Sequence, residues 1–168
     1  MIQITQKQVM REVKCLNKML LNKKCFLIPV ALVLVATMLM LPLASAVTYA
    51  YVSSVTGSYG VSYPERVISK DGSYAIFDGY DSKITVQMTV QGPSGAAIQI
   101  YAKAFSGSPY VQCWSSPTGQ PGSWVPAGQA SIGSEGWYTI GYLQGSHQYI
   151  GIANSGGSLY VDQIRIQY

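Results

Sequence analysis

The sequence predicts an all-β domain, an antiparallel sandwich or barrel, behind an N-terminal leader. After Ala46 the chain has no helical period, and apolar and polar residues alternate in about eight or nine short runs separated by turn residues. The last run continues to the end of the chain, so its terminus is expected to be tied into a sheet. All 17 Gly and 13 Tyr follow Ala46, which separates the turn-rich domain from the leader.

Residues 1–46 have the pattern of a secretory signal peptide. Lys23-Lys24 precede an apolar run over residues 26–41, and Ala44-x-Ala46 supplies a small-residue cleavage site after Ala46. The run is short for a membrane span, which needs about 20 apolar residues, although an uncleaved anchor is the alternative. A start at Met19 would give a more ordinary basic segment. Cleavage predicts a secreted or cell-surface protein with one domain, residues 47–168.

The leader also accounts for the basic character of the chain. The whole sequence carries a charge of +4, but six basic residues and one acidic residue lie before Ala46, and five basic and six acidic residues lie after it. The charge is therefore no argument for a nucleic-acid partner. Cys15 and Cys25 leave with the leader, so Cys113 has no disulfide partner, and no Cys/His spacing indicates zinc.

The first expected strand covers residues 47–54, and a Ser- and Gly-rich loop is expected over residues 53–62. The strand at residues 83–91 has the clearest alternation, with Ile84 and Val86 on its apolar face. The other strands are expected at residues 73–77, 97–105, 110–115, near 123–125 and 129–132, and at 137–143, 148–153 and 158–168.

The terminal strand changes its apolar phase once. Leu159 and Val161 share one parity, whereas Ile164 and Ile166 share the other. A one-residue bulge near Asp162-Gln163 would return both pairs to the core. In the strand at residues 110–115, Cys113 has the parity of the apolar positions, and we expect it to be buried and unreactive.

Three pieces of the chain, in order, resemble galactose-binding-domain-like jelly rolls. Residues 64–67 and 71–75 are similar to the "P…V…DG-x-Y-A" opening of that group, and residues 111–116 with Trp124 and Gly128 to its "V-x-V-S…W-x-x-x-G" middle. Residues 149–152 and 156–166 are similar to its closing hairpin, which often reads "L-x-V-D-x-I-x-I". The resemblance implies a two-sheet antiparallel jelly-roll β-sandwich. Trp114 departs from it, because a small polar residue is usual there.

No catalytic constellation emerges from the sequence, so we expect no enzyme activity. His147 is expected to be exposed in a turn, and Asp71, Asp78 and Asp81 occupy turn positions, where Asp bonds the local backbone. In jelly rolls of the resembled group, an acidic residue in the last strand can help to hold a structural calcium. The resemblance therefore implies a calcium site at Asp162 with Asp71 and Asp78, and otherwise no cofactor. The alternative is an Asp162 bonded to backbone amides or to Arg66.

The expected ligand patch combines outward-facing aromatic and amide side chains of two strands. A short turn at residues 106–109 should make these strands antiparallel neighbours, so that their outward residues lie across from one another. The members of the patch are Tyr101, Tyr110, Trp114, Gln99 and Gln112. Trp114 and Tyr110 could instead cover a sheet edge or pack under a loop. Trp124 and Trp137 are expected to be structural.

The sequence predicts a secreted, non-catalytic binding module whose partner is a glycan or another cell-surface polymer. The alternative is a structural surface or filament subunit that forms homo-oligomers through the same sandwich. Its polar faces carry Thr, Gln, Ser and Tyr rather than Lys and Glu, which suits an extracellular role.

Overall fold

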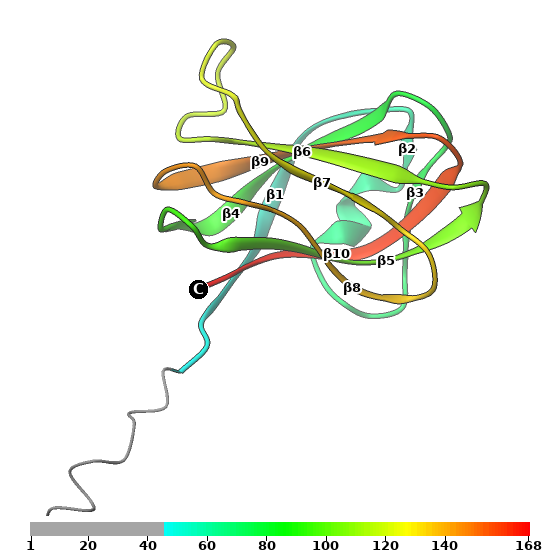
Figure 1. Cartoon of the computed structure of the whole chain (residues 1–168), viewed down its shortest axis with the longest axis horizontal. Coiled ribbons are helices and arrows are strands. Elements are labelled where there is room, and N and C mark those ends of the chain that lie inside the picture. The colour runs from blue at the N-terminus through cyan, green and yellow to red at the C-terminus, as the bar shows by residue number, and fades with distance from the viewer. Residues whose placement is uncertain (1–45) are drawn as a thin grey trace, which may run out of the picture. The chain divides into compact units, whose positions relative to one another are not determined.

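The protein is described by a computed structural model, in which residues 46–168 are defined (Figure 1). Residues 1–45 of the expected signal peptide, including Met19, lie outside this range. The described part contains ten strands and one short 3-10 helix. They are β1 (Tyr49–Tyr59), β2 (Val61–Ser62), η1 (Pro64–Val67), β3 (Ala75–Phe77), β4 (Ser82–Gly92), β5 (Ala97–Ser106), β6 (Tyr110–Ser116), β7 (Val125–Ser131), β8 (Gly136–Tyr142), β9 (His147–Ser155) and β10 (Ser158–Gln167).

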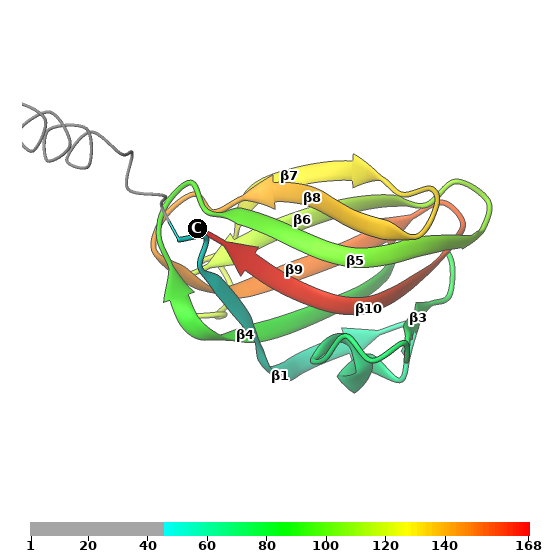
Figure 2. The same cartoon turned by 90° about the horizontal axis from the view of Figure 1, so that it is seen from below.

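The strands form two antiparallel layers, which confirms the predicted sandwich. Sheet A contains β2, β3, β10, β5 and β8, and Figure 2 shows β10, β5 and β8 side by side in one layer. Sheet B contains β4, β9, β6 and β7. Strand β1 belongs to both, because Tyr49–Tyr51 pair with β10 and the strand then pairs with β4 from Val52 onward. No helix within residues 46–168 is long and apolar enough to cross a membrane.

The core between the sheets is filled by the alternating apolar residues of both layers. Phe77, Ile84, Met88, Ile100 and Ile152 are among the large side chains that are completely or almost completely buried. The predicted bulge in β10 is confirmed, since the pairing with β5 shifts register between Val161 and Gln163. The two apolar residues before the bulge and the two after it therefore all reach the core, namely Leu159, Val161, Ile164 and Ile166. Asp162, at the bulge, is buried as well.

Two strand predictions were wrong in extent. The expected Ser/Gly loop at residues 53–62 is largely strand, because β1 continues to Tyr59 and pairs with β4 across two register shifts. At these shifts Ser53 and Thr56 donate side-chain hydrogen bonds to carbonyls of β4, so hydroxyl groups support an irregular edge that propensity alone disfavours. The two expected short strands near residues 123–132 are a single strand, β7, from Val125 to Ser131.

The expected pairing of β5 with β6 was also wrong. Strand β5 pairs with β10 and β8, whereas β6 pairs with β7 and β9, so the turn between β5 and β6 carries the chain from sheet A to sheet B. The β6–β7 connection extends beyond the body of the sandwich, in yellow-green in Figure 1. This connection and the outer face of sheet B shape the groove described below.

Candidate binding groove

The expected ligand patch is divided between the two outer faces of the sandwich. Gln99 and Tyr101 belong to β5 in sheet A, and Tyr110, Gln112 and Trp114 belong to β6 in sheet B. All five have the outward parity that was predicted for them. They do not form one patch, however, because their strands lie in opposite layers.

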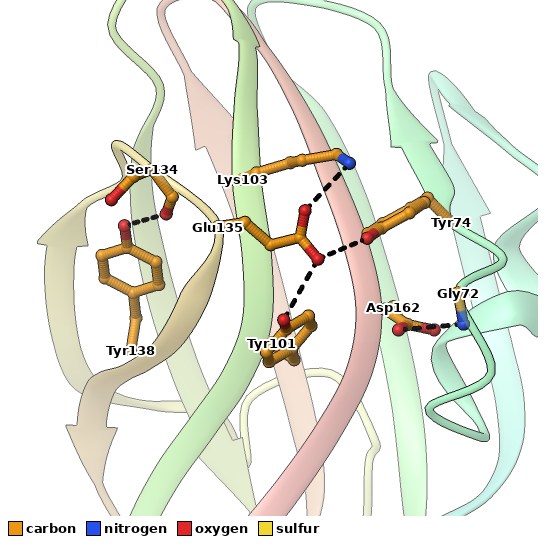
Figure 3. Close-up of polar contacts among 8 residues, drawn as sticks. All are labelled: Gly72, Tyr74, Tyr101, Lys103, Ser134, Glu135, Tyr138 and Asp162. Carbon is orange, nitrogen blue, oxygen red and sulfur yellow. Dashed lines mark hydrogen bonds and ion pairs between the residues drawn. The ribbon is translucent and has the colours of Figure 1, made fainter.

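On sheet A, the polar groups of Tyr101 and Gln99 and the ring of Tyr101 already make contacts within the protein. The Tyr101 hydroxyl donates a hydrogen bond to Glu135 at 3.1 Å (Figure 3), and Gln99 accepts one from Arg165 Nε at 2.9 Å. The Lys70 ammonium lies 4.1 Å from the centre of the Tyr101 ring, and the ring packs edge-on against Trp137 at 5.5 Å. Little of Tyr101 therefore remains for a ligand.

Glu135 fastens this face together. Its carboxylate accepts hydrogen bonds from the Tyr74 hydroxyl at 2.9 Å, the Tyr101 hydroxyl at 3.1 Å and Lys103 Nζ at 3.1 Å (Figure 3). These bonds, with that from Tyr74 the strongest influence, lower the pKa of Glu135 below its ordinary value. The cluster links the turn before β8 to β5 and to the segment before β3, and we interpret it as a structural clasp.

The expected calcium site at Asp162, Asp71 and Asp78 is not assembled. Asp162 is 2% exposed, and its carboxylate accepts hydrogen bonds from the backbone N–H groups of Asp71 and Gly72, each at 3.2 Å; Figure 3 shows the bond from Gly72. The Asp71 carboxylate accepts from Ser73 N and Ser69 Oγ, and that of Asp78 accepts from Ser62 Oγ. No group of three His, Cys, Asp or Glu side chains in residues 46–168 could hold a metal ion. The two backbone hydrogen bonds of Asp162 match the alternative expected for this residue.

His147 was expected in an exposed turn, but it is buried at the start of β9. Its Nδ1 lies 2.8 Å from Ser115 Oγ, and Ser115 is completely buried. Burial lowers the pKa of the His147 imidazole. Because Ser115 is completely buried and His147 is 9% exposed, we interpret this pair as a packing contact.

The outer face of sheet B carries a groove with a floor of small residues. Strand register places Thr85 of β4 beside Gly151 of β9, and Gly151 beside Trp114 of β6. Ala153 is the next outward residue of β9. Because Gly151 has no side chain, the six-membered ring of Trp124 can lie against the strand there: an added Cβ would be 3.3 Å from Trp124 Cζ3.

The first half of the groove is a hollow of about 350 Å³. The two indoles of Trp114 and Trp124 line it together with Asp81 and Lys83. Within the described residues, neither indole is stacked with another ring or a cation, unlike the rings of sheet A.

The charged groups of this half form no ion pair within the described residues, although Lys83 Nζ lies 5.3 Å from the centre of the Tyr59 ring. The ion pair found in residues 46–168 joins Lys103 and Glu135, and the side chains of Asp81 and Lys83 form no hydrogen bond within that range. Asp81 also has a left-handed backbone, with φ at 66°. Asp and Asn adopt this conformation more readily than other non-glycine residues, as is usual in turns.

The second half is an adjoining hollow of about 430 Å³. It has neutral polar walls from the β6–β7 connection, with Thr118 and Gln120, and from Thr56 of β1, and Tyr149 adds an aromatic surface. The buried Ser116 hydroxyl holds the connection in place. It accepts hydrogen bonds from the backbone N–H groups of Thr118 at 3.2 Å and Gly119 at 2.8 Å, and it lies 2.6 Å from Ser123 Oγ.

Of the five expected ligand residues, Trp114 alone lines either hollow. Gln112 is the next outward residue of β6 after Trp114 and lies opposite Ala153. Tyr110 is the outward residue after that and lies opposite Ser155. Trp124 was expected to be structural, yet it borders both hollows, and Asp81 was interpreted as a turn residue. A usable signal was the outward parity of Tyr149, Gly151 and Ala153 on β9, since small residues at outward positions leave room above a sheet.

Comparisons with known proteins identify the fold. No family model and no curated protein matches the sequence. Among solved structures, a pectin-binding carbohydrate-binding module has a TM-score of 0.51 at 14% identity, with 70% of this chain and 91% of that one covered. The C-terminal CBM6 of LamC, a laminarinase from Zobellia galactanivorans, has a TM-score of 0.51 at 16% identity over 73% and 99% of the two chains.

A third solved structure, the N-terminal domain of the single-strand break repair protein XRCC1, has a TM-score of 0.53 at 8% identity over 71% of this chain and 98% of its own. Proteins with such different names on one architecture illustrate that a fold does not determine a function. At these identities the similarity concerns the fold alone: the described residues form a jelly-roll β-sandwich of the same fold as these structures.

Proposed function

We propose that this domain is a non-catalytic carbohydrate-binding module whose ligand lies in the groove on sheet B. The observation that carries the proposal is the combination of two free indoles, Trp114 and Trp124, with the side chains of Asp81 and Lys83, which form no ion pair within residues 46–168, over a floor of small residues. Sugar rings stack their C–H faces on aromatic rings, and carboxylates and ammonium groups bond their hydroxyls. Carbohydrate-binding modules among the structures of similar fold support this assignment.

The proposed role suits a protein outside the cell, where polysaccharides are found. We therefore propose that the leader directs secretion and that the mature chain acts in the extracellular space or at the cell surface. The scarcity of charge on the outer strands accords with this location. A role as a self-associating surface subunit would instead show concentration-dependent assembly in analytical ultracentrifugation.

The test is to replace each groove tryptophan and measure binding and thermal unfolding side by side. Laminarin, pectin and alginate are suitable probes in affinity electrophoresis. Trp114→Ala and Trp124→Ala should each weaken binding at least about fivefold, because stacking on an aromatic ring contributes roughly 1 kcal/mol. Their melting temperatures should change little, since both side chains are partly exposed.

Trp137→Ala is the matched control on the opposite face. Trp137 contacts Tyr101 and lies 3.5 Å beneath the Arg165 guanidinium, so its loss should lower the melting temperature and leave binding intact. The proposal fails if no polysaccharide binds, or if the two groove variants bind as well as the parent protein.

A further inference from the structure

The groove is longer than one sugar unit and has two parts. The two hollows share Thr85 and Trp124 in their walls, so a chain that leaves one enters the other. Each volume lies in the range of about 300–1,000 Å³ that is common for pockets of small molecules. Along β9, Tyr149 lines one hollow and Ala153 the other, which corresponds to roughly 13 Å at the rise of an extended strand.

The chemistry of the two halves differs. The half beside Trp114 presents one carboxylate, Asp81, and one ammonium group, Lys83. The half beside Tyr149 presents neutral hydroxyl and amide groups, and within residues 46–168 the Gln120 side chain has no hydrogen-bond partner. Hydroxyl and amide groups can both donate hydrogen bonds to sugar hydroxyls and accept them. A carboxylate accepts such bonds and an ammonium group donates them, so both halves suit a neutral or weakly acidic sugar chain.

We propose that the groove binds an internal stretch of a linear polysaccharide, with at least one unit on each side of Trp124. Asp81 and Lys83 bond the units in the first half, and Thr118 and Gln120 bond those in the second. The inference rests on the proposed function, and it adds the class of ligand: a continuous chain rather than a single terminal sugar.

The test measures affinity against chain length. Laminari-, galacturono- and mannurono-oligosaccharides of two to six units are titrated calorimetrically for the polymer that binds. Affinity should rise about tenfold or more from two units to four or five and then level off, because each half adds its own stacking and hydrogen bonds. Converting the reducing end to an alditol should leave the affinity of the six-unit ligand unchanged within twofold.

Two conservative variants separate the halves. Gln120→Ala should weaken the six-unit ligand several-fold and leave the two-unit ligand unchanged, since a short ligand can remain beside Trp114. Asp81→Asn should weaken both, and Asn tolerates the left-handed backbone of this position. Gln129→Ala is the matched control, because Gln129 is an exposed glutamine of β7 outside both hollows, and it should change nothing.

A two-unit ligand that binds as tightly as a six-unit ligand, with Gln120→Ala silent throughout, would overturn the inference. The proposed function would stand in that case, provided that Trp114→Ala still weakened binding at least about fivefold. An affinity and a length dependence that are both unchanged in Trp114→Ala and in Trp124→Ala would overturn both, since the chain would then occupy another surface.

Discussion

Asp162 offers a direct test of how the buried carboxylate is held. In Asp162→Ala the backbone N–H groups of Asp71 and Gly72 lose their acceptor, and both bonds are near the long end of the normal range at 3.2 Å. A hydrogen bond to a charged group contributes about 1.5–3 kcal/mol, so the lower value for each bond gives a loss of about 3 kcal/mol. For a domain of this size, about 3–4 °C per kcal/mol predicts a fall in melting temperature of roughly 10 °C.

The measurement is thermal and urea unfolding of the parent protein and the variant, each with excess calcium and with a chelator. Asp78→Ala is the matched control: this carboxylate is exposed and bonds Ser62, so its loss should cost no more than about 0.5 kcal/mol. Neither addition nor removal of calcium should move the melting temperature of the parent protein. A calcium-dependent rise that Asp162→Ala abolishes would show that the carboxylate binds metal and that the hydrogen-bond reasoning is wrong.

Three further predictions concern the thiol, the acidic clasp and the leader. Burial raises the pKa of the Cys113 thiol to about 12, so a thiol reagent at pH 8 should label the native protein far more slowly than the unfolded one; equal rates would mean that the strand parity is reversed. Because the folded pKa of Glu135 is lowered from 4.5, its stabilising effect is present at neutral pH and lost as pH falls through the folded pKa. Glu135→Gln should therefore be less stable than the parent protein at pH 7, with a difference that shrinks below pH 4; a difference that is constant with pH would exclude the charge as its source. The N-terminus of secreted protein should be Val47, and an intact leader in the membrane fraction would instead indicate an anchor.

Alternation along single strands could be predicted from the sequence because it is a local property. The faces of β5, of β6 and of β4 as far as Met88 follow directly from period-two patterns, whereas Val90, predicted on the buried face of β4, is exposed. The phase change of β10 was sufficient to place its bulge. The burial of Cys113 follows from the same parity rule, and it is confirmed at 1% exposure. None of these predictions depends on how the strands pair with one another.

Contacts between distant segments could not be predicted in this way. The environment of His147 is set by Ser115 on another strand, and the extension of β1 to Tyr59 is set by its pairing with β4. The groove belongs to the same class, since it depends on Gly151, Thr85 and Trp114 meeting in register. The sequence around a tryptophan in a polar loop, such as Trp124, does not indicate which strand its ring will contact.

The division of the aromatic residues between two faces coincides with a close contact between two turns. The β5–β6 turn crosses from sheet A to sheet B, and the β9–β10 turn crosses back beside it. Their backbones touch so closely that a Cβ on Gly107 would lie 2.8 Å from Gly157 Cα, and both glycines have positive φ. Only glycine allows this approach. A short Gly- and Ser-containing turn is equally compatible with a hairpin, so the turn alone could not show that Tyr101 would join the clasp of sheet A while Trp114 faces the groove of sheet B.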